Sequence, residues 1–427
     1  MQHPARSTFK LKGFACPYTH SMSNATPGDA VSIYLHVPFC TVRCSYCDFN
    51  TYANLESLIP SWENALLAEL SQWAPAVAGR PVPTVFFGGG TPSLLEGQTV
   101  ARILDVIRRS YCLMPAAEIS LEANPESVDL DRLTAYRTAG VTRLSIGVQS
   151  LDEAELRFLD RLHDAERAAH AVRLARAAAF DSVSLDLIFG LPQQSLVGWR
   201  RSLEGALALA PDHLSCYALT IEDGTPLAAR AAAGQVREAD QDVSAEMADW
   251  TEDCLAAAGY VQYEISNFAR PGHACRHNLA YWQHREYVGV GPGAHGFVDG
   301  VRYAVERSPS RYITAMAKPR ASTLPSPAIV SEESIDDATA VLDTVILGLR
   351  LNAGVDVEAL ATRYVATWER FQPALEWATA AELLTRDASR LRLTRKGRRL
   401  ANEVFVRLME PSLTAATTAP PTPLKKI

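Results

Sequence analysis

The sequence predicts an α/β protein whose main domain is an open, partial TIM-like barrel of six β/α units. From residue 32 to about residue 219, short apolar segments alternate with longer segments in which apolar residues recur every three or four positions. This alternation indicates parallel strands joined by crossover helices. Six units are fewer than the eight of a closed barrel, so we expect the sheet to remain open.

Each expected element follows from its local pattern of apolar residues. The expected strands are Ile33–Val37, Thr84–Phe87, Glu118–Leu121, Arg143–Ile146, Ser182–Ile188 and His213–Ala218. The expected helices between them are Ser57–Trp73, Gln98–Arg109, Leu130–Ala139, Ala165–Ala178 and Leu196–Ala208.

Polar residues occur at or just past the carboxyl ends of these strands, namely Cys40, the turn at 88–91, Glu122, Gln149 and Asp186. Loops at that end of a β/α barrel converge on one mouth, where sites are built. Turn formation alone would explain the glycines. It explains poorly why Glu122 and Asp186 stand within otherwise apolar strands.

The rest of the chain is expected to form smaller units around this barrel. Residues 1–29 are interpreted as a flexible extension, or as the product of an upstream start codon with Met22 as the true start. The barrel spans 30–222 and is followed by an extension over 223–330, rich in Tyr, Trp, His and Gly. Residues 331–410 are expected to form an α+β, winged-helix-like accessory domain, and 411–427 a flexible tail.

Composition favours a cytoplasmic globular protein. Hydrophobic residues make up 48% of the 427 residues, charged residues 21%, and no apolar run is long enough to cross a bilayer. Eight cysteines are too few for a disulfide framework. A net charge of −7 disfavours nonspecific attraction to nucleic acid. A basic cluster at 386–399 leaves nucleic-acid binding open, but acidic residues interrupt it and a solvated helix is the preferred interpretation.

Three cysteines are spaced C-x3-C-x2-C directly after the first strand: Cys40, Cys44 and Cys47. Three thiolates on one short loop can bind three irons of a cubane [4Fe-4S] cluster and leave the fourth iron open to an exchangeable ligand. The alternative is a structural zinc site, which needs a fourth ligand from a distant residue. The spacing favours the cluster.

The motifs together resemble the radical S-adenosylmethionine superfamily, and within it the oxygen-independent coproporphyrinogen III dehydrogenase-like group. The resemblance covers residues 31 to 410 and rests on the cysteine motif and on eight further segments. These are Phe86–Ser93, Glu122–Pro125, Gly140–Ser150, Arg161–His163, Asp186–Pro192, Tyr263–Phe268, His277–Trp282 and Gly289–Gly296.

The resemblance implies which residues hold S-adenosylmethionine. The matching positions are Tyr34, Gly89, Gly90, Thr91, Glu122, Gln149, Arg161 and Asp186. Their chemistry agrees, because carboxylates accept hydrogen bonds from ribose hydroxyls or an ammonium group, and a guanidinium can clamp a carboxylate. A phosphate cradle at residues 88–90 is disfavoured, since no lysine follows and the pattern G-x-G-x-x-G is absent from this turn.

One departure from the group's pattern separates its two branches. The dehydrogenases carry a further cysteine shortly after the third cluster ligand, whereas Asp48 and Phe49 follow Cys47 here. The resemblance therefore implies the heme-chaperone branch, which binds heme and transfers it to an acceptor protein, and it puts dehydrogenase activity in doubt. The alternative function is oxidative decarboxylation of coproporphyrinogen III in porphyrin biosynthesis.

The same branch associates the motif H-N-x-x-Y-W with heme, which here is His277, Asn278, Tyr281 and Trp282. Neutral imidazole is a standard axial ligand, and aromatic rings offer flat apolar surface to a porphyrin. The rival ligands are His36, His273, His284 and His295. The expected partners are heme, an unidentified acceptor protein that could be a membrane protein, and an electron donor protein. Homodimer formation is left open, and no nucleic-acid partner is expected.

Overall fold

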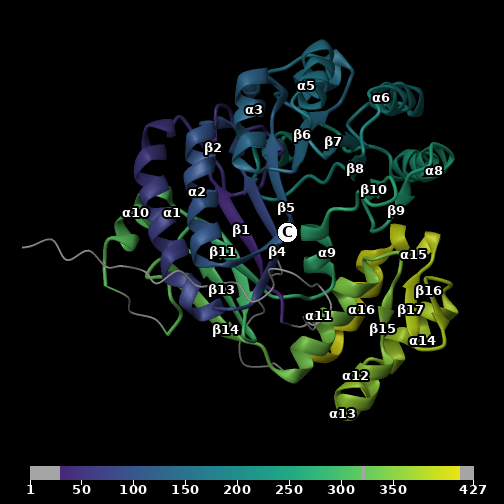
Figure 1. Cartoon of the computed structure of the whole chain (residues 1–427). Coiled ribbons are helices and arrows are strands. Elements are labelled where there is room, and N and C mark those ends of the chain that lie inside the picture. Colours follow the sequence, from purple (N-terminus) through teal and green to yellow (C-terminus); the bar gives the residue numbers. More distant parts are fainter. Residues whose placement is uncertain (1–28, 320–322, 414–427) are drawn as a thin grey trace, which may run out of the picture.

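The computed structural model describes residues 29–319 and 323–413, and within them twelve strands form one sheet. The strand order is β14-β13-β12-β11-β1-β4-β5-β6-β7-β8-β10-β9. Every pairing from β11 through β8 is parallel, and the pairings outside that block are antiparallel. The sheet curves with its helices outside and remains open, as Figure 1 shows.

The six predicted β/α units are confirmed, and the parallel strands follow chain order across the sheet. The strands are β1 (Ser32–Val37), β4 (Pro81–Gly89), β5 (Cys112–Ala123), β6 (Arg143–Gln149), β7 (Ser182–Phe189) and β8 (His213–Ala218). The helices between them are α1 (Ile59–Trp73), α2 (Gly97–Ser110), α3 (Leu130–Ala139), the short α4 (Glu153–Phe158), α5 (Ala165–Ala177) and α6 (Leu196–Ala208).

The helices begin where a side chain satisfies a free backbone N–H. Asp129, Asp164 and Ser195 each accept a hydrogen bond from the first turn of α3, α5 and α6 respectively. Helix α3 ends at Gly140, whose φ of 109° lies in the left-handed region that glycine adopts without strain. These capping residues explain why the predicted starts of the three helices coincide with the observed ones.

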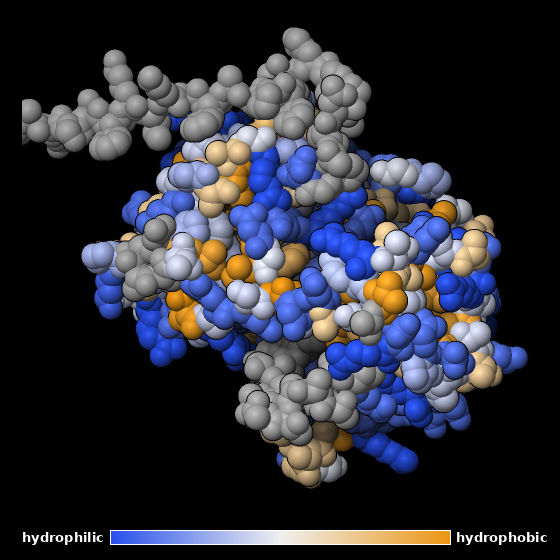
Figure 2. Space-filling model, turned by 90° about the horizontal axis from the view of Figure 1, so that it is seen from below, coloured by the Kyte–Doolittle hydropathy of each residue, from blue (hydrophilic) through white to orange (hydrophobic). Residues whose placement is uncertain are grey.

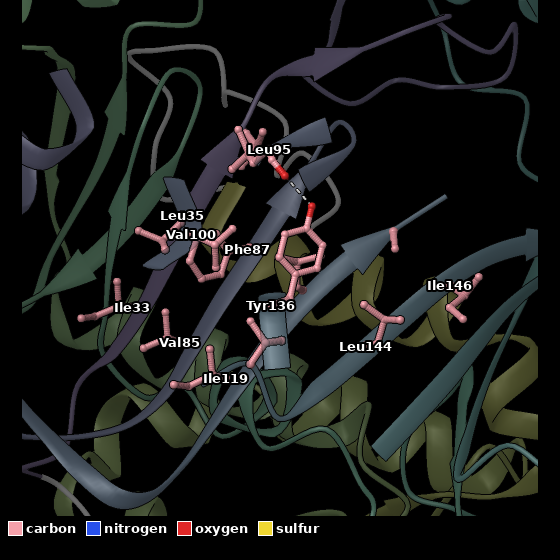
Figure 3. Close-up of a cluster of buried hydrophobic side chains, with 14 of the residues drawn as sticks. Ile33, Leu35, Val85, Phe87, Leu95, Val100, Ile119, Tyr136, Leu144 and Ile146 are labelled. Carbon is pink, nitrogen blue, oxygen red and sulfur yellow. Dashed lines mark hydrogen bonds between the residues drawn. The ribbon is translucent and has the colours of Figure 1, made fainter. Parts of the chain in front are cut away.

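The main core lies between the sheet and this outer layer of helices (Figure 3). Ile33, Leu35, Val85 and Phe87 are fully buried on the helix side of β1 and β4. Tyr136 of α3 reaches into this core and donates a hydrogen bond of 2.5 Å to the Leu95 carbonyl oxygen. Because side chains alternate along a strand, the other face of the sheet is left for polar residues.

The expected extension over 223–330 completes the same sheet on both sides of the barrel. Its strand β11 (Tyr287–Val290) pairs in parallel with β1, so β1 is an inner strand. The remaining added strands are β9 (Val261–Gln262), β10 (Asn267–Ala269), β12 (His295–Val298), β13 (Val301–Val305) and β14 (Ile329–Ser334). The added helices are α7 (Pro226–Ala232), α8 (Gln241–Ala257), α9 (Arg276–Trp282) and α10 (Pro309–Met316). The sheet thus crosses the predicted boundary at residue 222.

The C-terminal region has a hydrophobic core of its own. A small antiparallel sheet, β15 (Val355–Asp356), β17 (Arg390–Leu393) and β16 (Leu384–Asp387), contains the ribbon expected near 391–393. The helices are α11 (Asp337–Leu349), α12 (Glu358–Arg363), α13 (Val365–Glu369), α14 (Gln372–Ala380), α15 (Arg395–Arg399) and α16 (Ala401–Leu413). Helix α16 continues past the expected start of the tail at residue 411.

Helix α15, the centre of the basic cluster, forms ion pairs with the barrel side of the molecule. Arg395 lies 2.9 Å from a carboxylate oxygen of Asp249, and Arg398 lies 2.6 Å from one of Glu252, both in α8. Arg399 also contacts Asp249. These pairs link the C-terminal region to α8, while Lys396 and Arg399 are exposed, as in a solvated helix.

The residues expected to form the flexible N-terminal extension (1–29) and the flexible tail (411–427) lie, for the most part, outside the described residues. In the part of the chain that the structure describes, no helix is both long and apolar enough to cross a membrane. Hydrophilic and hydrophobic residues are interspersed on the face seen in Figure 2.

Candidate functional site

The parallel strands present a polar face toward the inside of the barrel, here called the inner face. It carries Ser32, Tyr34, His36, Thr84, Phe86, Glu118, Glu122, Arg143, Ser145, Ser184, Asp186 and His213. Hydrogen bonds link neighbouring strands across it, such as Thr84 Oγ1 to Ser32 Oγ at 2.8 Å and Ser145 Oγ to Asp186 Oδ1 at 3.1 Å. Polar residues were expected at the carboxyl ends of the strands, and the inner face also carries them at the amino ends, as at Ser32, Arg143 and His213.

The three cysteines lie on a loop whose base is closed by a short parallel pair, β2 (Phe39–Cys40) and β3 (Tyr52–Ala53). Within the loop, Cys47 N donates to Cys44 O at 3.1 Å, which turns the chain between the two cysteines. The loop is also tied to the barrel, because the backbone N–H of Ser45 donates to Asp160 at 3.0 Å. The loop is thus anchored at both its base and its tip.

Hydrogen-bond donors from other elements reach the cysteine sulfurs. Thr91 Oγ1 donates to Cys40 Sγ at 3.5 Å, and Arg161 Nη1 donates to Cys44 Sγ at 3.7 Å. Burial, together with the nearby Cys47 and Cys44, raises the pKa of the Cys40 thiol to about 11, although the hydrogen bond from Thr91 lowers it. The three sulfurs therefore lie near one another.

In the described ranges, no three His, Cys, Asp or Glu side chains converge as ligands of a single metal ion. Each thiolate of a cubane cluster binds a different iron, so the sulfurs of such a site need not converge on one point. The donors from Thr91 and Arg161 suit sulfurs that carry negative charge. The residues present fit a cluster site.

The glycine turn after β4 packs directly against the segment that leads to Cys40. Gly90 N donates to Val37 O at 2.7 Å, and a Cβ at Gly90 would lie 3.0 Å from Cys40 Sγ. Gly89 has a φ of 113°, and a Cβ there would lie 2.6 Å from a ring carbon of His36. The turn therefore requires glycine, both for its conformation and for the close approach of its backbone.

Two predicted carboxylates, Glu122 and Asp186, lie close together on the inner face. Burial and the charge of Asp186 raise the pKa of Glu122 to about 8. A hydrogen bond of 3.1 Å, donated by Gly89 N, acts in the opposite direction and lowers the pKa. Burial also raises the pKa of Asp186, although Ser145 donates to both of its carboxylate oxygens. An incoming cation or hydroxyl donor would satisfy both groups.

Arg161 and Gln149 meet at the end of β6, where the strand is irregular. The register shifts between Gly147 and Gln149, and Gln149 has a φ of 66°. Arg161 Nη2 donates to Asn124 Oδ1 at 2.7 Å and to Gly147 O at 2.9 Å, while its buried Nε has no partner. Such bulges re-aim side chains beside functional sites. Seven of the eight predicted S-adenosylmethionine positions thus lie at the strand ends or on the inner face, and Arg161, which follows α4, reaches the end of β6 through its bond to Gly147 O.

Tyr34 is held by His36 on the same strand. His36 Nε2 faces the carbonyl oxygen of Asn50 at 3.0 Å, so that nitrogen carries the proton and Nδ1 accepts from Tyr34 OH at 3.0 Å. Burial lowers the pKa of His36 to about 4, which keeps the ring neutral. The arrangement fixes the orientation of the Tyr34 hydroxyl and links β1 to the cysteine loop.

The predicted heme motif forms α9, whose first residues lie against the inner face. His277 is fully buried, and both ring nitrogens have partners, Thr84 Oγ1 at 2.8 Å and Tyr281 OH at 2.9 Å. Phe86 stacks on its ring at 5.1 Å. Burial lowers the pKa of His277 to about 3. In this conformation neither nitrogen is free for iron, so heme ligation by His277 stays a prediction that requires α9 to move.

The other members of the motif are more accessible. Asn278, Tyr281 and Trp282 are half-buried. Trp282 lies against the Arg350 guanidinium, with 4.4 Å between Arg350 Cζ and the ring centroid. Tyr281 packs edge-on against Tyr287 at 4.6 Å. Tyr281 thus lies beside His277 and the inner face, whereas Trp282 packs against the C-terminal region.

The rival histidines lie in four different settings. His36 has both nitrogens bonded, and His284 is stacked on Phe297 at 4.9 Å with its Nδ1 bonded to Thr344. His273 is half-buried and His295 exposed. His295 lies close enough to His36 to lower the pKa of that ring.

Two functional residues were missed because their partners are remote in sequence. Asn50 Nδ2 donates to the carbonyl oxygens of Pro292 and Arg307, both at 2.9 Å, and so fixes the cysteine loop to the segment 289–296. Glu118 of β5 accepts from the backbone of Arg276 and His277 at 3.2 and 3.1 Å and caps α9. In the sequence, Asn50 is marked only by its place after the cysteines, and Glu118 only by its place at the start of an apolar strand.

The arrangement defines a radical S-adenosylmethionine type of protein, and comparisons with known proteins agree. Residues 34–204 match the Radical SAM superfamily, and residues 335–400 match the HemN C-terminal domain. A solved structure described as coproporphyrinogen III oxidase (HemN) from Escherichia coli, a radical SAM enzyme, has the same fold, with a TM-score of 0.76 at 23% identity. That likeness covers 90% of this chain and 91% of the other.

Several curated relatives carry the name heme chaperone HemW. The Mycobacterium tuberculosis protein is 42% identical over 386 residues, which is 90% of this chain and 96% of the relative. The Bacillus subtilis protein is 34% identical over 88% of this chain and 98% of the relative. The chain belongs to the HemW family.

Proposed function

We propose that this protein is a heme chaperone, which binds heme and transfers it to an acceptor protein while carrying a [4Fe-4S] cluster and S-adenosylmethionine. The observation that carries the proposal is the similarity to relatives named heme chaperone HemW over nearly their whole length. The absence of a further cysteine directly after Cys47 supports it against the dehydrogenase alternative.

The cluster would be held by Cys40, Cys44 and Cys47, and S-adenosylmethionine by the eight inner-face and strand-end residues. A bound cluster supplies an electron and an open iron for the amino acid end of that cofactor. Thr91 and Arg161 stabilise charge on the sulfurs, since each donates a hydrogen bond to one of them. Glu122 and Asp186 offer carboxylate oxygens to the ribose or the ammonium group.

Heme ligation by His277 would require its bond to Tyr281 to open. Removing that hydroxyl in Tyr281→Phe frees Nε2, so the variant should bind heme several-fold more tightly, since a neutral hydrogen bond contributes about 1 kcal/mol. His277→Ala should lack the change in heme absorbance that we expect the parent protein to give on binding. Equal heme affinity and an unchanged Soret band in both variants would reject His277 as the ligand and turn attention to His273 and His295.

The test of the whole proposal is anaerobic reconstitution, followed by iron and sulfide analysis and a heme titration of the same sample. We expect a cluster and stoichiometric heme, and transfer of that heme to an apoprotein such as an apocytochrome. Incubation with coproporphyrinogen III and a strong reductant should give no protoporphyrinogen. Stoichiometric protoporphyrinogen would favour the dehydrogenase instead. A cytoplasmic location, an electron donor protein and a membrane-protein acceptor complete the proposal.

A further inference from the structure

Arg350, the residue after α11, is a half-buried cation without an ion pair among the described residues. Its guanidinium lies within 4.0 Å of no carboxylate in that part of the chain and forms no hydrogen bond with it, and its buried Nε has no partner. The buried carboxyl group of Glu264, whose backbone pairs with Leu351, acts on the charge of Arg350 from beyond that distance. Buried charges are normally paired, because removing an ion from water costs free energy.

Packing on Trp282 does not satisfy this guanidinium. The Arg350 Cζ lies 4.4 Å from the centroid of the Trp282 ring, which is a cation–π contact. That contact is not a hydrogen bond, so it leaves the N–H donors of the guanidinium unused. The Trp282 Nε1 is also buried without a partner. Both side chains of the pair therefore keep unused donors.

The pair lies where α9 meets α11. Trp282 is the last residue of α9, the helix that carries the proposed heme motif, and Arg350 directly follows α11. The backbone of the next residue, Leu351, pairs with that of Glu264 in the extension over 223–330. Arg350 therefore lies where the C-terminal region meets the extension that carries the heme motif.

These donors match a carboxylate attached to a flat apolar body. A guanidinium binds a carboxylate through two parallel hydrogen bonds, and an indole ring provides a surface for an aromatic plane. We propose that Arg350 and Trp282 form a carboxylate site that binds a propionate group of the tetrapyrrole. The inference rests on the proposed function and adds the group of the ligand that is recognised. The carboxylate of S-adenosylmethionine is the other source of the same chemistry.

An iron-free porphyrin separates propionate recognition from iron ligation. The reconstituted full chain is titrated by fluorescence with deuteroporphyrin IX and with its dimethyl ester, in which both propionates are blocked. In Arg350→Gln we expect deuteroporphyrin IX to bind roughly 10- to 100-fold more weakly, as the loss of a charged hydrogen bond predicts, with little change for the ester. Arg350→Lys, which keeps the charge but not the planar fork, should recover part of this loss.

Arg407 provides a matched control, since it stacks on Trp377 at 3.9 Å but lies exposed on α16. Arg407→Gln should bind both porphyrins as the parent does. Equal affinity of Arg350→Gln and the parent for deuteroporphyrin IX would overturn the inference. Equal losses for both porphyrins would make Arg350 a structural residue and overturn it too.

Two further measurements separate the remaining outcomes. Loss of S-adenosylmethionine binding in Arg350→Gln, with porphyrin affinity unchanged, would assign the site to that cofactor and overturn the inference. A parent protein that binds neither heme nor porphyrin would refute the proposed function itself. A parent protein that binds heme while Arg350→Gln matches it in every titration would refute only the carboxylate site.

Discussion

Gly90→Ala tests whether the glycine turn supports the cluster loop. In the structure, the added Cβ would lie 2.6 Å from Phe39 O, 2.9 Å from Val37 O and 3.0 Å from Cys40 Sγ. Two of these atoms are backbone oxygens, which cannot rotate away as a flexible side chain would. The segment from Val37 to Cys40 must therefore move by several tenths of an ångström, or the turn must open.

The expected cost follows from overpacking in a well-packed region, which is typically about 1–3 kcal/mol. The same movement also displaces Cys40 Sγ, the first expected cluster ligand. We expect Gly90→Ala to be less stable in urea unfolding by this amount and to hold less than about half of the parent's iron and sulfide after reconstitution, because a site must keep its geometry to within about 0.5 Å.

Gly198→Ala is the matched control for this experiment. Gly198 is a buried residue of α6 whose added Cβ would meet nothing closer than Ser195 Oγ at 3.4 Å. It should retain the parent's iron content, and as a helix residue it should gain a little stability. If Gly90→Ala kept full stability and full cluster content, the assignment of Gly90 as a support of the cluster loop would be wrong.

Three other predictions test the site and its scaffold. Cys44→Ser should lose most of the iron and sulfide while Cys254→Ser, outside the loop, keeps them; equal contents would remove the cluster from this loop. The pKa of Glu122 is raised to about 8, so the stability from its retained proton is present at low pH and is lost as pH rises toward 8. In urea unfolding, the free energy of unfolding of Glu122→Gln relative to that of the ligand-free parent should therefore rise by about 2–4 kcal/mol between about pH 4.5 and pH 9. A difference that stays constant with pH would refute the shift. Arg398→Ala should cost about 1–2 kcal/mol and speed hydrogen exchange in α15, because its pair with Glu252 at 2.6 Å is partly buried; unchanged exchange would show that this pair does not hold the C-terminal region.

The six units of the barrel could be predicted because their signals are local. Apolar periodicity separates Ser182–Phe189 from Leu196–Ala208, and residues such as Asp129 and Ser195 mark helix starts. The cysteine spacing likewise lies within eight residues of chain. Local patterns therefore predicted the scaffold and the proposed cluster ligands.

What could not be predicted depends on contacts between distant segments. The strand β11 has only four residues, and nothing in Tyr287–Val290 indicates that it pairs with β1. The bonds that occupy His277 come from Thr84, which is 193 residues away, and from a neighbour one helical turn along. Arg350 lies in an apolar segment, and the fact that it forms no ion pair within 4.0 Å among the described residues appears only in three dimensions.

The order in which the sheet is assembled has a consequence for biosynthesis. Strand β1 leads into the cysteine loop, yet its outer edge pairs with β11, some 250 residues later in the chain. The hydrogen-bond donors of buried Glu69 in α1 also come from that later region. Its carboxylate accepts from Gly291 N and Tyr312 OH, both at 2.8 Å. While the ribosome is still translating, this edge lacks its partner, and unpaired edges invite aggregation. The cysteine loop likewise lacks the bonds from Asn50 to Pro292 and Arg307 until that later region has been translated.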